Sequence, residues 1–437
     1  MSLDAVTAFV SAPAPPEAAR HMAATLLIDT LAVCAGAAPL EVGRIARDHA
    51  VRHIGGTDAR LLFDGRRASI PGACFAAASQ TDNLDAHDGL NLTKGHIGCA
   101  VVPALFAFAE GREVTGPDAL DLMVMAYEVA ARAAMALHGT VEDYHTSGAW
   151  NGLGVAALGW RMLDAPTPAL HEALGIAEYH GPRSQMMREI AHPTMLHDGS
   201  GMGAMTGAMA ALLAADGFTG APAITVEDAG VAHIWADLGA NWTITQNYIK
   251  PYPICRWAHA ALDALSALRQ AHGFAVDEVR QIEVRTFAQA AALYPGMPDT
   301  TSQAQYSLPF ALASLLRFGR IGAEHVSGPA LQDPATAALL PLITVSEVPE
   351  LSARYPAERI SEVVVTLGDG RRLASGVVTA RGGPEAPMPD AEIEGKVRAL
   401  AAPTLGDAGA AALWAMRDRL LEPGMTMAQL EPLIYPS

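Results

Sequence analysis

The stretch GPDALDLMVMAYEVAARAA, residues 116–134, decides the fold class of this chain. Pro117 suits the first position of an α-helix, because the N–H group that proline lacks has no partner there. The apolar side chains that follow recur at helical spacing: Leu120, Met123, Tyr127, Ala130 and Ala134. Alanine favours helix because it loses no side-chain entropy there. The stretch therefore predicts an alanine-rich α-helix.

Helical patterning of this kind extends outward, from about residue 16 to residue 271. Within it, Gly203, Gly207 and Ala211 lie four residues apart, so their small side chains share one helix face. Such a face lets a second helix approach closely. We expect it to serve either packing inside the domain or an interface between subunits.

The pattern changes near Val276. Residues 279–286 alternate apolar and polar side chains, which is typical of a half-buried β-strand. Further on, segments 361–367 and 372–380 flank a Gly-Asp-Gly turn, which indicates a β-hairpin. This part of the chain therefore predicts strands mixed with helices.

The length of 437 residues favours two domains over one hydrophobic core. We predict a mainly α protein with a large all-helical domain and a smaller α+β domain. The helical domain is expected over residues 1–270, completed by C-terminal helices in residues 388–437. The α+β domain is expected over residues 271–387.

Composition narrows the class of function. The net charge of −17 argues against nucleic acid and anionic membrane surfaces as partners, because both attract basic patches. The N-terminus lacks the basic and apolar regions of a signal peptide, and the apolar runs near residues 101–109 and 204–215 are short for a membrane span. The four cysteines are scattered without a CxxC pair, which predicts reduced thiols, no structural zinc or iron–sulfur cluster, and a cytoplasmic location.

Ionisable residues gather in a few segments of this weakly charged chain. Asp85, Asp88 and His96 are spaced so that they could serve as acid/base groups or as metal ligands. Lys94 beside His96 would weaken the binding of a divalent cation, so we predict no metal. The alternative is structural: Asp85 would cap a turn, and His96 would cap the helix that begins near Cys99.

A second such segment is Tyr144-His145-Thr146-Ser147, which precedes a helix rich in small residues. The positive end of a helix dipole would lower the pKa of a histidine placed at its N-terminus. His145 is therefore a candidate acid/base group, with a hydrogen-bonded capping role as the alternative. Tyr144 is a candidate substrate contact or a packing residue.

Two further segments carry positive or titratable groups. His197 precedes another helix N-terminus, in a GxGxG context without the preceding strand that a dinucleotide fold requires. Lys250 stands before Pro251-Tyr252-Pro253, a stiff run that would hold its amine in place, and Arg256 follows. A lone lysine is otherwise most often a solvated surface charge.

These segments occur in an order that resembles the MmgE/PrpD family, which includes 2-methylcitrate dehydratases, cis-aconitate decarboxylases and iminodisuccinate epimerases. The matching motifs, between residues 84 and 310, are LDAHD (84–88) to His96, YEVAAR (127–132), YHT (144–146), HDGSGMGAMTG (197–207), KPYPIC (250–255) and QAQYSLPF (303–310). Each motif alone is weak. The ordered set is specific for the family but not for one reaction.

The resemblance implies a homodimer and cofactor-independent proton chemistry on small di- or tricarboxylates, in a pocket between domains. Asp85, His96, His145 and Lys250 match family active-site positions. Two features depart from the family pattern. His197 replaces a lysine, and the segment 85–89, DAHDG, stands where the decarboxylases have Asp-Phe-Asp-Asp-Thr, so one aspartate and the threonine are lost. These departures disfavour a decarboxylase.

The chemistry expected is removal of a proton α to a carboxylate, which needs a base and fixed positive charge near the developing oxyanion. We predict that His145 and His96 act as base and acid in either order, with Asp85 orienting a histidine. His197 would replace the family lysine when protonated, so activity would fall as pH rises through its pKa. Lys250 is predicted to bind a carboxylate. Substrate contacts are predicted at Arg256, Asp88, Tyr144 and Tyr252.

A β-elimination, as in a 2-methylcitrate dehydratase, is preferred over epimerisation because it is the family's usual activity. The two reactions share their first step, so the residue types do not separate them. A non-catalytic carboxylate-binding protein is the alternative of another class, motivated by the changes at His197 and Gly89. A purely structural helical protein would leave the histidines and Lys250 unexplained.

Overall fold

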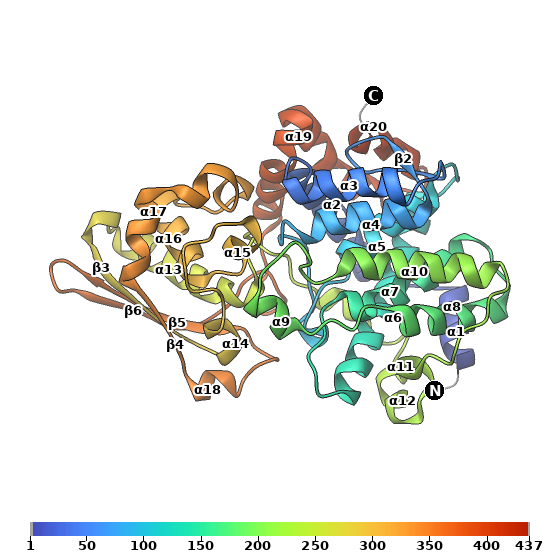
Figure 1. Ribbon diagram of the computed structural model, residues 1–437, viewed down its shortest axis with the longest axis horizontal. Coiled ribbons are helices and arrows are strands. Elements are labelled where there is room, and N and C mark those ends of the chain that lie inside the picture. Colours follow the sequence, from blue (N-terminus) through green and yellow to red (C-terminus); the bar gives the residue numbers. More distant parts are fainter. Residues whose placement is uncertain (1–2, 436–437) are drawn as a thin grey trace.

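The computed structural model describes residues 3–435, and its architecture confirms the predicted fold class: mainly helical, with a smaller α+β part. Figure 1 shows the helical domain on the right and the sheet-containing domain on the left. The helices of the large domain before the linker are α1 (Leu3–Ser11), α2 (Glu17–Ala37), α3 (Glu41–His53), α4 (Ile70–Asp82), α5 (Gly98–Ala109), α6 (Gly116–Thr140), α7 (Gly148–Met162), α8 (Thr167–His180), α9 (Met186–Ala191), α10 (Ser200–Ala215), α11 (Ile224–Glu227) and α12 (Ala232–Trp235). A two-stranded ribbon, β1 (Ala59–Arg60) with β2 (Arg67–Ala68), adjoins them.

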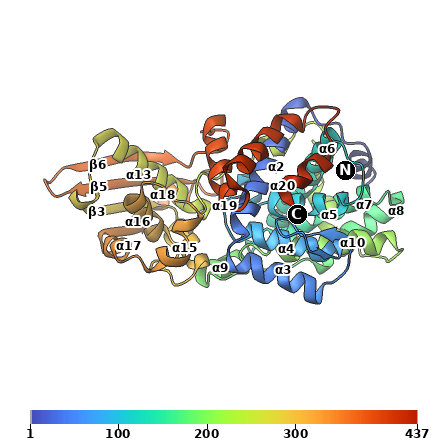
Figure 2. The same ribbon diagram turned by 90° about the horizontal axis from the view of Figure 1, so that it is seen from above.

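The small domain is built on a four-stranded sheet of order β4-β3-β5-β6. Only the β3–β4 pair is parallel. Its elements are α13 (His259–His272), β3 (Val279–Thr286), α14 (Ala288–Ala291), α15 (Thr301–Gln305), α16 (Leu308–Phe318), α17 (Pro334–Leu339), β4 (Ile343–Glu347), α18 (Pro349–Ser352), β5 (Ile360–Leu367) and β6 (Arg372–Thr379). The chain then returns to the large domain through α19 (Asp390–Arg419) and α20 (Glu431–Ile434), and Figure 2 shows α19 beside α2.

The helix predicted from residues 116–134 is the core of the large domain. Thr115 caps the N-terminus of α6, and its Oγ1 accepts a hydrogen bond from the backbone N–H of Asp118. The helix therefore begins where Pro117 suggested. All five of its periodic apolar residues are buried, because α6 is surrounded by other helices. The strand at 279–286 has the predicted bounds, and the hairpin differs by one residue at its outer ends. Strand β4 was not predicted; it is short and has one buried residue.

The small-residue face of α10 packs inside the large domain, against α7. A Cβ atom on Gly207 would lie 2.3 Å from the carbonyl oxygen of Gly152, and one on Gly203 would lie 2.8 Å from that of Gly148. The two helix backbones are in contact there. Of the two roles that the sequence left open, the structure shows the packing role.

Helix α2, which was not among the apolar runs considered from the sequence, has the length and hydropathy of a membrane span. It is the one helix among the described residues that meets this criterion, and 72% of its apolar window is buried inside the protein. The core helix of a compact domain has the same composition, so this finding is weak support for a membrane span.

Two hydrophobic cores hold the molecule together. The first joins residues from the N-terminal helices with residues of α19 and α20, such as Val397 and Ile434. The second spans the sheet and its helices, and it also takes in Met186 and Ile190 of α9. The segment around α9 therefore bridges the two domains and helps to place the connections between them.

Candidate functional site

A small cavity of about 20 Å³ lies between the domains, where loops from both meet. Four of its sides come from the large domain and the linker: the α4–α5 loop, the α6–α7 connection, the turn before α10, and residues 248–257. The small domain adds the end of α15 and the residue before β5. The lining residues are Asp85, Lys94, His96, Tyr144, Met186, Asp198, Tyr248, Cys255, Arg256, Trp257, Tyr306 and Arg359.

His96 is the imidazole that the structure places in this cavity. Its Nδ1 lies 2.6 Å from the backbone oxygen of Asp88. A carbonyl oxygen can only accept a hydrogen bond, so Nδ1 carries the proton and Nε2 has a free lone pair. Burial, with the nearby charge of Lys250, lowers the pKa of His96 well below its usual value. His96 is therefore a neutral imidazole in the ligand-free protein.

Asp198 faces the free nitrogen of His96. Its Oδ2 lies 3.4 Å from His96 Nε2. Burial, together with the nearby carboxylates of Asp82 and Asp85, raises the pKa of Asp198 to about 8. A neutral carboxyl group beside a neutral imidazole is an arrangement that can accept and return a proton.

Ser147 connects the segments that carry His96 and Asp198 by hydrogen bonds to both. Its Oγ accepts a hydrogen bond from the backbone N–H of His96, at 2.9 Å, and donates to Asp198 Oδ2, at 3.0 Å. Gly95 allows this approach, since a Cβ atom there would lie 2.5 Å from the same Oγ. The loop that carries His96 and the turn that carries Asp198 are thus joined through one side chain.

The left-handed backbone of the turn before α10 directs Asp198 into the cavity. His197 has a φ of +44° and Gly199 a φ of +69°. Such a conformation is uncommon for a residue with a side chain. Ser200 then begins α10, and its N–H donates to Asp82 Oδ2 at 3.1 Å. The end of α4 is thereby tied to the start of α10.

The buried carboxyl groups around this site make stability depend on pH. Burial raises the pKa of Asp82 and of Asp88 to about 7, and that of Asp198 to about 8. An unfolded chain ionises these groups near pH 4. Their contribution to stability is therefore complete below about pH 4 and is lost as pH rises to about 8, with a slope of up to about 1.4 kcal/mol per pH unit for each group.

Melting temperatures of the ligand-free protein are accordingly expected to fall between about pH 7 and pH 8, above the pH range in which the lowered pKa values of buried histidines such as His96 and His197 act in the opposite direction. Asp198→Asn keeps a neutral side chain at all pH values, so this variant should show a shallower fall. A flat melting profile of the parent protein over this range would contradict the raised pKa values.

Lys250 and Asp85 form a buried ion pair at the edge of the cavity. Lys250 is 0% exposed, and its Nζ contacts the Asp85 carboxylate and donates to the Asp85 backbone oxygen at 3.0 Å. Burial raises the pKa of Asp85, and the Lys250 ammonium opposes that rise. The structure thus brings the two predicted residues together. The ammonium of Lys250 is largely neutralised by the Asp85 carboxylate, which leaves less of its charge for a ligand.

Positive charge without a carboxylate partner lies across the same cavity. Arg359, 4% exposed, stands over the Tyr355 ring, and its Nε and Nη1 have no hydrogen-bond partner among the described residues. Lys94, half-buried, has no carboxylate partner within residues 3–435, and burial together with Arg359 lowers its pKa. Two cations from different domains therefore face one cavity, which suits an anionic ligand.

Arg256 lines the cavity as predicted, but its terminal nitrogens are engaged. Nη1 donates to the backbone oxygen of Arg381 and Nη2 to that of Ala380, and the guanidinium lies 4.2 Å from the Tyr248 ring centre. Burial lowers the pKa of Arg256 to about 10, so it stays charged at neutral pH. The two terminal nitrogens therefore cannot bind a carboxylate together. Nε, which is buried and has no partner among the described residues, is the free donor.

His145 lies away from this constellation and is not part of the cavity lining among the described residues. Its backbone pairs with Gln185, and its carbonyl oxygen accepts a hydrogen bond from His138 Nε2 at 3.2 Å. Burial and Arg183 lower its pKa. Its side chain makes no capping hydrogen bond to α7, so the capping alternative is not seen, and the acid/base role stays a prediction.

His197 is near the site but is buried behind it. Its ring packs against Tyr306, with ring centres 5.2 Å apart. Burial and the positive charges nearby lower the pKa of His197 to about 3. Desolvation thus disfavours, in the ligand-free protein, the protonated His197 that the predicted replacement of the family lysine requires.

Of the three remaining predicted substrate contacts, one lines the cavity and two do not. They are Tyr144, Asp88 and Tyr252. Tyr144 lines the cavity, and its hydroxyl donates to the backbone oxygen of Lys94. The carboxylate of Asp88 is turned into the core, where Asn247 Nδ2 donates to it at 2.5 Å, while its carbonyl holds His96. Tyr252 donates to Asp263 Oδ1 at 3.0 Å and lies outside the lining.

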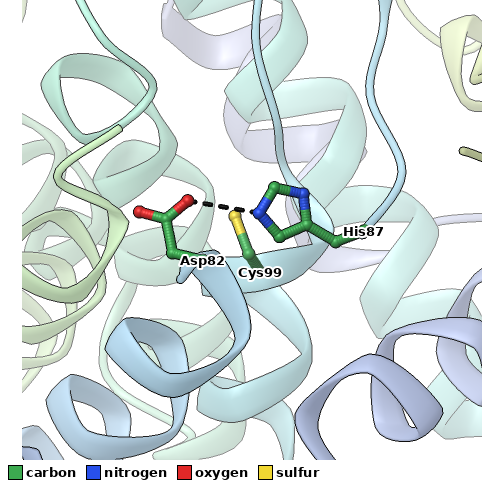
Figure 3. Close-up of side chains that lie close together, drawn as sticks. All are labelled: Asp82, His87 and Cys99. Carbon is green, nitrogen blue, oxygen red and sulfur yellow. Dashed lines mark hydrogen bonds and ion pairs between the residues drawn. The ribbon is translucent and has the colours of Figure 1, made fainter. Parts of the chain in front are cut away.

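Behind the cavity, three potential metal ligands lie together: Asp82, His87 and Cys99 (Figure 3). His87 Nε2 is 3.2 Å from Asp82 Oδ1, and Cys99 Sγ donates to Ser200 Oγ at 3.2 Å. These contacts satisfy the same atoms that would bind an ion. Burial raises the pKa of Cys99 well above its usual value, so the thiol keeps its proton. In the ligand-free protein these contacts support the loop that carries His96, and Asp85, His87 and His96 form a second group of close potential metal ligands.

Sequence reasoning missed Asp198, Arg359 and Tyr306 as parts of the site. Asp198 lies in the motif of residues 197–207, where only its neighbour His197 was considered as a site residue. Tyr306 stood in another. Arg359 lies outside every motif, and its only signal is a buried, unpaired charge that the sequence does not reveal.

Comparison with protein families accounts for nearly the whole chain. The model of the MmgE/PrpD N-terminal domain matches residues 5–240, and that of the MmgE/PrpD C-terminal domain matches residues 252–421. The break between the two matches falls in the linker that carries Tyr248 and Lys250. A search of curated proteins found no match to this chain.

Proposed function

Because this chain belongs to the MmgE/PrpD family, we propose that it is a lyase of the 2-methylcitrate dehydratase type. It would remove a proton α to a carboxylate of a small di- or tricarboxylate and expel a group from the β carbon. Family membership supports a lyase-like enzyme. The substrate and the leaving group are the added steps of the proposal.

The observation that carries the proposal is the charge balance of the cavity. Arg359 and Lys94 face it without carboxylate partners among the described residues, and Arg256 offers its Nε. A buried charge without a partner costs several kcal/mol, so a protein that keeps one gains from an anionic ligand. Carboxylates of the substrate would supply the missing negative charge and would be held on groups from both domains.

His96 Nε2 is the base that fits this position. Its lone pair is free because Nδ1 donates to the Asp88 carbonyl. The positive charges that lower the pKa of His96 would be balanced by the bound carboxylates, which raises its basicity when substrate is present. The α-carbanion that forms would be stabilised by the cation that holds the adjacent carboxylate.

Asp198 completes the elimination. The electron pair of the broken C–H bond forms the new C=C bond, and the β leaving group departs with its own bonding pair. An oxygen leaving group needs a proton, and the carboxyl of Asp198 holds one at neutral pH. The proton taken by His96 can then restore Asp198 through the 3.4 Å contact between them.

Epimerisation needs a second proton donor on the opposite face of the carbanion. His96 is the one imidazole in the cavity lining among residues 3–435. His145, its predicted partner, is not in that lining. The carboxyl group of Asp198 could also act as such a donor, so elimination is preferred only as the family's usual activity, and epimerisation of an iminodisuccinate-like diacid is the second candidate.

The direct experiment is proton NMR of the purified protein with a panel of acids in D2O. The panel contains 2-methylcitrate, citrate, cis-aconitate, iminodisuccinate and hydroxy- and amino-succinates. Loss of an α-proton signal with a new alkene signal is the expected result. Exchange without an alkene would replace the lyase by an epimerase. A raised melting temperature without exchange would replace both by a carboxylate-binding protein.

The remaining expectations rest on the family resemblance. We propose a cytoplasmic homodimer that needs no cofactor and binds neither nucleic acid nor membrane. Sedimentation of the purified protein tests the dimer, and activity after exhaustive dialysis against a chelator tests the cofactor.

A further inference from the structure

Lys396 reaches the catalytic loop from a helix far away in sequence. It lies on α19, which packs beside α2 (Figure 2). Its Nζ donates to the backbone oxygen of Ala86 at 2.7 Å and to Asp29 Oδ2, on α2, at 2.8 Å. The side chain is 7% exposed. The contact thus fixes one peptide of the loop to the body of the large domain.

Ala86 stands at a sensitive place in that loop. Asp85, which pairs with Lys250, directly precedes it. His87, which packs against the His96 ring with centres 4.5 Å apart, directly follows it. Asp85 also has a φ of +55°, a conformation that needs support from its surroundings. A shift of the Ala86 carbonyl would move the groups on both sides.

The use of lysine in this chain adds an independent observation. Lysine and arginine together number 29, yet the lysines are only Lys94, Lys250 and Lys396. Lys94 and Lys250 both meet the cavity or its edge. Arginine fills the other basic positions, including most surface ion pairs. All three lysine side chains of this chain, each a compact ammonium with three donors, thus lie on or beside the loop of residues 85–96.

We propose that Lys396 is a positioning residue of the active site: through the Ala86 carbonyl it holds the loop of Asp85, His87 and His96 in its working geometry. The C-terminal helix would then be a functional part of the site as well as a packing element. The effect on turnover rests on the proposed function, whereas the effect on loop geometry does not.

Kinetics of Lys396→Met and Lys396→Arg test the first part. Lys396→Met keeps the length of the side chain but removes the donor, and we expect kcat to fall roughly 10- to 100-fold with a much smaller change in KM. Lys396→Arg keeps charge and donors and should recover part of kcat. The matched control is Arg398→Met, which removes an exposed ion pair with Glu394 from the same helix and should leave kcat unchanged. A Lys396→Met protein with a lower melting temperature but full kcat per folded molecule would make the role purely structural.

NMR of protein carrying 13C at the lysine ε carbon tests the geometry without turnover. The chain has three lysines, so three ε-methylene signals are expected, and Lys396→Met identifies one by its loss. The signals of Lys94 and Lys250 should both shift in Lys396→Met, because the loop contacts both, and neither should shift in Arg398→Met. Unmoved signals would overturn the proposal whether or not the parent protein turns over any acid.

Discussion

Replacing His96 with asparagine is expected to lower kcat for proton abstraction by roughly 10²- to 10⁴-fold, the usual contribution of a general base. The amide nitrogen of asparagine can take the place of Nδ1 and keep the hydrogen bond to the Asp88 carbonyl. Nothing replaces Nε2, which faces Asp198 and the cavity. The substitution therefore removes the base while leaving the loop in place.

The measurement is the rate of α-proton loss in D2O, with binding of the acid followed by its effect on the melting temperature. Binding should be retained in His96→Asn. His145→Asn is the matched control, because the structure places His145 away from the cavity lining. An effect of His145→Asn as large as that of His96→Asn would return the catalytic role to the residue favoured by the motif alone.

Replacing Arg359 with methionine is expected to change stability and function in opposite directions. Arg359 is buried, and two of its nitrogens have no hydrogen-bond partner in the described part of the chain. An apolar side chain of similar length removes that desolvation penalty, so the free energy of unfolding should rise by about 1–3 kcal/mol. Loss of the charge should weaken transition-state binding by about 2–5 kcal/mol, which lowers kcat/KM roughly 30- to 5,000-fold.

Urea unfolding and kinetics on the same preparations measure the two effects. Arg354→Met provides the control, since that residue forms an exposed ion pair with Glu358 on the surface nearby. It should leave kcat/KM unchanged and shift stability by less than about 1 kcal/mol. If Arg359→Met binds and turns over the acid as the parent does, Arg359 is not a ligand for carboxylate and the charge argument for the cavity is lost.

Three of the site's residues were within reach of sequence reasoning. Asp85, His96 and Lys250 were predicted from their motifs, and the structure brings them to one cavity edge. The identity of the base was left open between His96 and His145 because both precede helix N-termini. The cavity lining includes His96 and not His145 among the described residues, which favours His96 as the base, and the lining joins segments that no single motif connects.

The sequence by itself determined the helical class, the hairpin and the family. Periodicity and turn residues act over a few neighbouring positions, so α6 and β3 can be predicted from their own residues. The order of the motifs identified the family for a related reason: each motif is local, and their order along the chain is directly visible.

Only the tertiary structure decided which groups meet and which are charged. Lys250 reaches Asp85 across 165 positions of the chain, and Arg359 enters the cavity from another domain. The raised pKa of Asp198 and the lowered pKa of His197 both follow from burial, which depends on how the helices pack. Desolvation and long-range contacts are properties of the folded molecule, because they arise from side chains that the sequence keeps far apart.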